Sequence, residues 1–131
     1  MYRVLMYEDE KGRSELEKEL MSLAKEAIQN KDARIQFKQI TYCIELLKQK
    51  GTRLPNTITK HLIDDLWELR PGNNRIIYFY FKDNTFVLLH MFRKKTQKTP
   101  RQEILKAKTE YLDYIKRNEE NHYENMGKLQ R

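Results

Sequence analysis

The sequence predicts a single α+β domain in which a helical hairpin packs on a small antiparallel sheet and a C-terminal helix follows, in the order β-α-α-β-β-β-α. Two consecutive segments have the apolar spacing of amphipathic helices. Three later segments, joined by short turns, have the composition of strands. The length of 131 residues suits one domain with its own core. We therefore expect one domain over residues 1–117 and a polar tail over residues 118–131.

The first half of the chain predicts one strand and two helices. Residues 2–7 are rich in β-prone side chains and alternate between two faces. A helix is expected over residues 14–30, because Ser14 begins a capping-box pattern. A second helix is expected over residues 32–51, ended by Gly51, because its apolar residues keep the helical spacing: Ala33, Phe37, Ile40, Ile44 and Leu47.

The second half predicts a three-stranded meander and a final helix. Strands are expected at residues 65–70, 74–82 and 85–93, and the short turns between them force antiparallel neighbours. The last two strands are apolar on both faces, which predicts that both faces of the sheet are covered. Thr99 is expected to cap the final helix and Pro100 to begin it. The apolar side chains of this helix are Ile104, Leu105, Tyr111, Leu112 and Ile115.

Composition excludes several classes of protein. No apolar stretch is long enough to cross a membrane, and no signal-peptide pattern follows the N-terminus. One cysteine excludes an internal disulfide framework, and the three histidines lie far apart in the sequence without ligand spacing. Glycine is too rare for a phosphate-binding loop. We expect a soluble, cytoplasmic protein with no cofactor, no metal and no membrane partner.

Positive charge is concentrated in one part of the chain. The net charge is +7, and residues 67–101 alone carry eight basic and two acidic side chains. Such a field on a small domain predicts a polyanionic partner, most often nucleic acid, although a basic face that only keeps the protein soluble is the alternative. Five cations fall within nine residues, with no acid between them: Arg93, Lys94, Lys95, Lys98 and Arg101.

These side chains suit the cleavage of RNA by its own 2′-hydroxyl, a reaction that needs neither a protein nucleophile nor a metal. Arginine can hold the phosphate and its developing charge, while a lysine, tyrosine or histidine can transfer protons. His90 and Tyr78 lie in apolar strands, where packing in the core is the alternative role. The candidate catalytic residues are Arg70, Arg75, Tyr78, His90, Lys94 and Lys95.

Three motifs in this region carry a resemblance to a known family. They are LWELR at residues 66–70, RIIY at residues 75–78 and LLHMFRKKTQKTP at residues 88–100. In order and spacing they resemble the phage-derived, HigB-like branch of the RelE/ParE toxin superfamily, over about residues 1–115.

The resemblance implies a RelE-like fold and a toxin of a type II toxin–antitoxin pair, neutralised by a cognate antitoxin. It also implies an endoribonuclease that cleaves mRNA, usually on the translating ribosome. Arg70 and Arg75 would then hold the scissile phosphate, and Lys94 or Lys95 would hold the flanking backbone or transfer a proton. The remaining acid or base would be His90 or Tyr78, and the further RNA-binding residues would be Arg93, Lys98 and Arg101.

Two other functions remain open at this point. A ParE-like protein of the same superfamily inhibits DNA gyrase and cleaves nothing itself. A non-catalytic module would use its basic strip only to bind nucleic acid. The concentrated charge favours RNA over gyrase, because a gyrase inhibitor does not need a pocket that holds phosphate.

Overall fold

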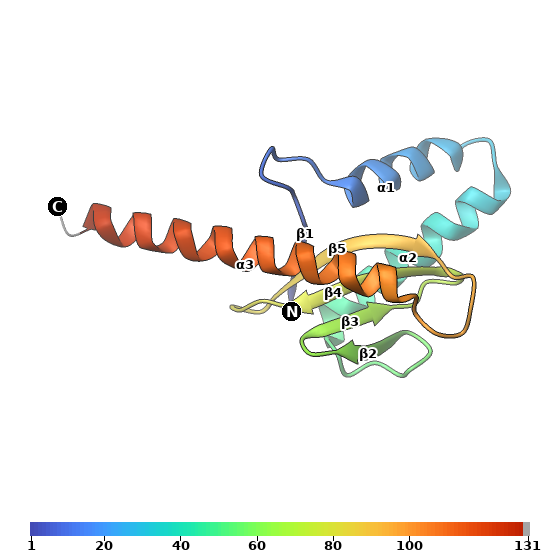
Figure 1. The fold of residues 1–131 in the computed structure, drawn as a ribbon. Helices are drawn as coiled ribbons and strands as arrows, with labels where there is room; N and C mark the ends of the chain where they lie inside the picture. Colours follow the sequence, from blue (N-terminus) through green and yellow to red (C-terminus); the bar gives the residue numbers. More distant parts are fainter. Residues whose placement is uncertain (130–131) are drawn as a thin grey trace.

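The structure is a computed structural model that describes residues 1–129, with side chains described through residue 119. The described residues form three helices and a five-stranded sheet, arranged as in Figure 1. The α+β class and the predicted helical hairpin are confirmed. In chain order the elements are β1 (Arg3–Met6), α1 (Glu15–Glu26), α2 (Lys31–Lys50), β2 (Thr59–Ile63), β3 (Leu66–Leu69), β4 (Asn74–Tyr80), β5 (Thr85–Arg93) and α3 (Arg101–Leu129).

The sheet differs from the prediction in two ways. Its strands lie in the order β1-β5-β4-β3-β2, so a strand that was not predicted, β2, forms one edge. The β2–β5 strands form an antiparallel meander, but β1 pairs in parallel with β5, which makes the sheet mixed. The helical hairpin between β1 and the meander carries the chain across the sheet, and this crossover allows the parallel pairing.

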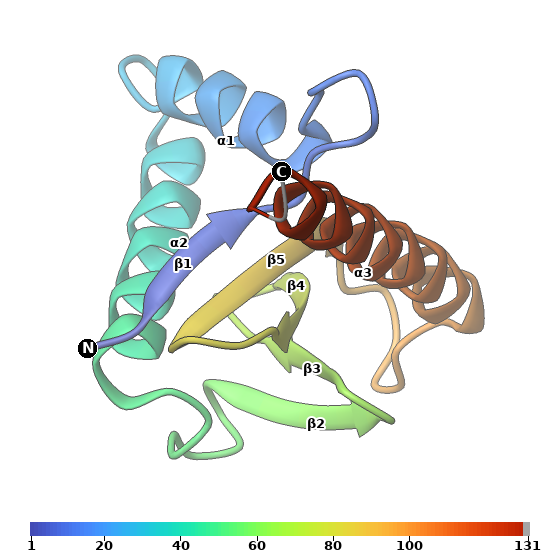
Figure 2. The same ribbon diagram turned by 90° about the vertical axis from the view of Figure 1, so that its left-hand side faces the viewer.

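Helices cover both faces of the sheet, as the apolar strands predicted. Figure 2 shows α2 and α3 on opposite sides of the strands. On one face α1 and α2 pack against a core cluster that includes Leu69, Tyr78 and Leu88. On the other face α3 packs against a second cluster that includes Ile77 and Phe79. We call these the hairpin face and the α3 face.

Local signals explain most of the helix ends. Ser14 caps α1 as predicted, since its hydroxyl accepts a hydrogen bond from the backbone N–H of Glu17. Asn30 caps α2 in the same way, so the first helix ends earlier than predicted, at Glu26. Gly51 ends α2 as predicted, with a φ of 60° that disfavours other residues. The predicted cap at Thr99 is wrong: α3 begins at Arg101, and the Thr99 hydroxyl bonds to a side chain of β3.

The last helix is longer than its contact with the sheet. Figure 1 shows α3 continuing past the strands, and it includes residues 118–129 of the expected tail; residues 130–131 lie outside the described part of the chain. Leu105 and Leu112 are 50% and 63% exposed, so the buried stripe of α3 is narrower than predicted. Among the described helices, none has the length and apolar character that crossing a bilayer requires.

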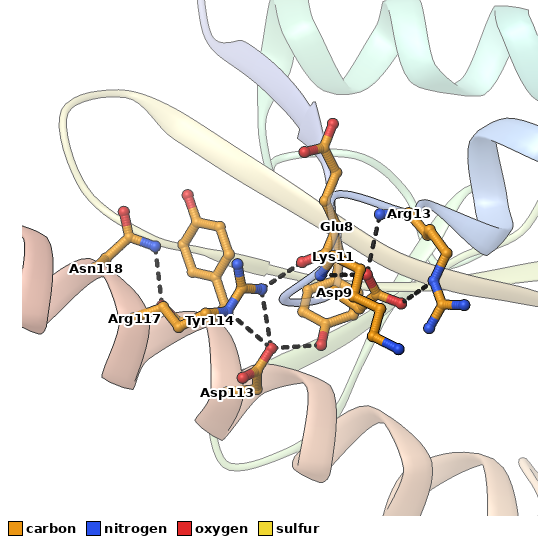
Figure 3. Close-up of polar contacts among 9 residues, drawn as sticks. Glu8, Asp9, Lys11, Arg13, Asp113, Tyr114, Arg117 and Asn118 are labelled. Atoms are coloured by element: carbon orange, nitrogen blue, oxygen red, sulfur yellow. Dashed lines mark hydrogen bonds and ion pairs between the residues drawn. The ribbon is translucent and has the colours of Figure 1, made fainter.

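A polar cluster ties the middle of α3 to the turn after β1 (Figure 3). The Tyr7 hydroxyl donates to Asp113 Oδ2 at 2.6 Å, and Arg117 donates both to that carboxylate and to the carbonyl of Glu8. Partial burial, reinforced by the Asp113 carboxylate, raises the pKa of Tyr7 to about 12. The phenol therefore stays a hydrogen-bond donor at all physiological pH values.

Candidate functional site

Two of the predicted arginines lie near one buried carboxylate, at the turn that joins β3 and β4. Arg70 follows β3, and its Nε donates to Glu68 Oε2 at 3.2 Å. Its Nη1 donates to the Asn56 carbonyl at 3.0 Å, and 23% of the side chain is exposed. Glu68 is only 2% exposed. The carboxylate thus holds the guanidinium of Arg70 near the surface of the α3 face.

Arg75 lies close enough to Glu68 and Arg70 for the charges of both side chains to affect it. It is half-buried near the start of β4, and its Nη1 donates to the carbonyls of Gly72 and Asn74, each at 2.8 Å. Burial lowers the pKa of Arg75; the Glu68 carboxylate opposes this shift and Arg70 adds to it. Because arginine stays protonated in proteins, Arg70 and Arg75 are both cations here, and the Glu68 carboxylate offsets part of their mutual repulsion.

The second oxygen of Glu68 reaches the basic segment that follows β5. Thr99 donates its hydroxyl to Glu68 Oε1 at 2.8 Å. Between β2, β3 and this segment lies a pocket of about 190 Å³, lined among others by Lys60, Arg70 and Lys98. We call Lys60, Glu68, Arg70, Arg75 and Lys98 the Arg70 surface. Its residues come from three strands, from the turn between β3 and β4, and from the segment between β5 and α3.

The other predicted cations are spread around this surface. Lys94 is half-buried and its backbone N–H donates to the Asn73 carbonyl, so it lies beside the turn that precedes Arg75. Lys95, Lys98 and Arg101 are exposed. Lys98 and Arg101 also line an open hollow of about 580 Å³ at the start of α3.

Arg93 is separated from this group. It pairs in register with Asn74, whose side chain donates to Gln36 of α2. Because paired residues of neighbouring strands point to the same face, Arg93 falls on the hairpin face.

The structure does not bring His90 to the surface. Its side chain is 1% exposed and lies under α3, where Nδ1 bonds to Glu110 at 2.5 Å and Nε2 to Glu103 at 2.8 Å. Burial alone lowers the pKa of His90, but the bonds to the two carboxylates outweigh it and raise the pKa above its ordinary value. A bulge in β5 creates this arrangement, because the register shift at Leu89 turns His90 toward α3.

Tyr78 also lies inside the domain. Its side chain has no exposed surface, and its hydroxyl contacts the Thr59 hydroxyl at 2.6 Å in the core of the hairpin face. Burial raises the pKa of Tyr78 to about 12. The structure therefore places the phenol on the other side of the sheet from the Arg70 surface.

Sequence reasoning missed two members of the Arg70 surface. Lys60 lies opposite Glu68 in the register of β2 and β3, and β2 was not predicted. In the sequence, Glu68 is distinguished only as one of two acidic residues in a basic segment. Its signal was the i, i+2 spacing to Arg70, which places both side chains on one face of a strand.

The arrangement is suited to binding phosphate. Arginine presents its donors in a planar fork that matches two phosphate oxygens, and lysines add charge at the rim. Partial burial strengthens these interactions relative to bulk water. Within the described residues, no group of three or more histidine, cysteine or acidic side chains is arranged to hold a metal ion.

Comparisons with known proteins were made for both sequence and structure. A search of curated proteins finds no match. Among solved structures, a chain of the archaeal RelE–RelB complex from Pyrococcus horikoshii OT3 is similar, with 20% sequence identity and a TM-score of 0.49, over 72% of this chain and 96% of that one. The pattern of the family described as phage-derived protein Gp49-like (DUF891) matches residues 18–112. Because this match spans more than half of the chain, the protein belongs to the phage-derived Gp49-like family.

Proposed function

We propose that this protein is the toxin of a type II toxin–antitoxin pair and an endoribonuclease that cleaves mRNA, with the Arg70 surface as its active site. The proposal rests mainly on one observation: the buried Glu68 binds Arg70 on a partly exposed face, and Arg75 lies close enough to be affected by the charges of both. The motifs that resemble HigB-like toxins include both arginines. The cognate antitoxin, mRNA and the translating ribosome are the proposed partners.

The proposed reaction is an in-line attack of the RNA 2′-hydroxyl on the adjacent phosphorus. A bond forms between phosphorus and the 2′-oxygen, and the bond to the 5′-oxygen of the next nucleotide breaks. The products are a 2′,3′-cyclic phosphate and a 5′-hydroxyl. One proton leaves the attacking hydroxyl for a base, and one reaches the leaving oxygen from an acid.

Arg70 and Arg75 would bind the non-bridging oxygens and stabilise the extra charge that develops on them. Lys94 and Lys95 follow β5 near the turn that precedes Arg75. We propose that they bind the RNA backbone beside the scissile phosphate or transfer a proton. His90 and Tyr78 are 1% and 0% exposed. We therefore propose that neither side chain contacts RNA. His90 instead holds α3 against the sheet through its bonds to Glu110 and Glu103.

Mapping of mRNA 5′ ends in a cell-free translation reaction tests the function. The reaction is run with and without the protein, and a third reaction contains the RNA and the protein but no ribosomes. The proposal predicts discrete new ends, each carrying a 5′-hydroxyl, in the translating reaction. New ends in both reactions that contain protein would indicate a ribonuclease that needs no ribosome.

Absence of new ends in both reactions would contradict the endoribonuclease. A supercoiling assay with DNA gyrase and a binding assay with labelled RNA would then separate the two remaining functions. A ParE-like inhibitor lowers gyrase turnover. A binding module without catalysis retains RNA with an affinity that falls steeply as salt rises, and each cation that is removed weakens it by a similar step.

A further inference from the structure

The least expected member of the Arg70 surface is its carboxylate. Glu68 is one of two acidic residues in a segment with eight cations, and it is 2% exposed. A negative charge at this place weakens the attraction for a polyanion, and its burial costs solvation energy. Its presence in a phosphate-binding site therefore calls for a role other than contact with RNA.

Both oxygens of Glu68 have partners, and the partners come from different parts of the chain. Oε2 accepts from Nε of Arg70, at the end of β3. Oε1 accepts from the hydroxyl of Thr99, in the basic segment before α3. One buried side chain thus joins the arginine to the segment that carries Lys94, Lys95 and Lys98.

Two of the three guanidinium nitrogens of Arg70 are bonded within the protein. Nε bonds to Glu68 and Nη1 bonds to the Asn56 carbonyl, and these two bonds fix the plane and the direction of the fork. An arginine without such partners samples many rotamers, and it loses that freedom when it binds phosphate. An arginine that is already oriented avoids this loss, which is the general basis of preorganised catalysis.

Resting on the function proposed above, we propose that Glu68 is a positioning residue, which orients Arg70 toward the scissile phosphate and holds the basic segment beside it through Thr99. It acts through these two residues and does not touch RNA. The charge of Glu68 therefore affects catalysis only while Arg70 is present to be oriented. A glutamine at this position can still accept a hydrogen bond from the Thr99 hydroxyl, so it keeps the basic segment in place.

The test is a double-mutant cycle with Glu68→Gln and Arg70→Lys. The first substitution keeps the size of the side chain and removes its charge, and the second keeps the positive charge and removes Nε and the fork. We measure the single-turnover cleavage rate at saturating RNA, the affinity for a 2′-O-methyl RNA that cannot be cleaved, and the melting temperature of all four proteins.

The expected result is strong coupling in the rate. Glu68→Gln lowers the cleavage rate of the wild type by about ten- to hundredfold, because a misplaced fork loses much of its effect in the transition state. In the Arg70→Lys protein the same substitution changes the rate less than about twofold, since there is no fork left to orient. Affinity for the 2′-O-methyl RNA changes little in Glu68→Gln.

Two further variants keep the test interpretable. Asp113→Asn breaks another carboxylate–arginine pair, the one with Arg117 shown in Figure 3, and should lower stability without lowering the cleavage rate. Thr99→Val keeps the shape of Thr99 and removes only the bond to Glu68. It should mainly weaken the affinity for RNA, because the basic segment is released while Arg70 stays oriented.

Three outcomes are decisive. Suppose that the wild type cleaves RNA and that Glu68→Gln lowers the cleavage rate by the same factor in the wild type and in Arg70→Lys. Glu68 then acts independently of Arg70, and the inference is overturned. If Glu68→Gln fails to fold, a cleavage rate in Thr99→Val that equals the wild type at all RNA concentrations overturns it. If the wild type cleaves no RNA, the proposed function itself fails, and this result is distinguishable from the first two.

Discussion

The buried histidine under α3 makes a strong prediction about stability. His90 bonds to two carboxylates of α3, Glu110 and Glu103, which are 12% and 28% exposed. In His90→Leu the side chain stays similar in size, but Glu110 and Glu103 both lose their hydrogen-bond partner. Removal of one member of a buried ion pair costs about 3–5 kcal/mol. We expect a loss near the lower end, about 3 kcal/mol, because Glu103 can regain part of its hydration.

The assay is chemical denaturation of the wild type and His90→Leu at pH 6 and at pH 9. The carboxylates raise the pKa of His90 in the folded state, so the folded protein holds this proton more tightly than the unfolded chain. The resulting stabilisation is fully present below the ordinary histidine pKa, about 6.5, and disappears as the pH rises through the raised value. The cost of His90→Leu should therefore be larger at pH 6 than at pH 9.

A matched control comes from the same helix. Lys108→Gln breaks an exposed ion pair with Asp64 at 3.8 Å, whose side chains are 39% and 72% exposed, and should cost less than about 1 kcal/mol. A loss below about 1 kcal/mol in His90→Leu, or a loss that grows with pH, would show that the bonds of His90 to Glu110 and Glu103 do not stabilise the fold as argued.

Two further predictions concern the core and a turn. Tyr78→Phe removes the hydroxyl that contacts Thr59 at 2.6 Å and should lower the free energy of unfolding by about 1 kcal/mol, measured by urea denaturation; no change would show that the contact contributes nothing. Gly51→Ala places a Cβ 2.9 Å from the Tyr2 ring at a φ of 60° and should cost about 1–3 kcal/mol, read as a lower melting temperature. A stable Gly51→Ala protein would contradict the assigned end of α2.

Local patterns predicted the elements whose signals are local. Ser14 and Gly51 act on their own helix ends, and both behave as expected. Thr99 has an equally good cap pattern, but a buried carboxylate 31 residues earlier takes its hydroxyl. Leu105 lies in the apolar pattern of α3, yet half of its surface is exposed because the helix turns a narrower stripe toward the sheet.

Features that depend on distant parts of the chain could not be predicted. The β2 strand is an edge strand with a charged and polar pattern, so it lacks the apolar alternation that identifies strands. The parallel pairing of β1 with β5 depends on the helical crossover that follows β1, and the residues of β1 alone do not indicate it. At the site, the charge pattern of the sequence identified Arg70 and Arg75. The bulge that turns His90 inward and the bond between Glu68 and Arg70 arise only once the sheet has formed.

The central claim is that the Arg70 surface carries out RNA cleavage, and Arg70→Ala tests it most directly. The measurement is the rate of mRNA cleavage in the translating reaction, compared with the wild type and with Lys38→Ala, which removes an exposed positive charge from α2. We expect Arg70→Ala to lower the rate by at least about a hundredfold, with the circular dichroism spectrum unchanged, while Lys38→Ala stays near the wild-type rate. A folded Arg70→Ala protein that cleaves within about twofold of the wild type would contradict the claim.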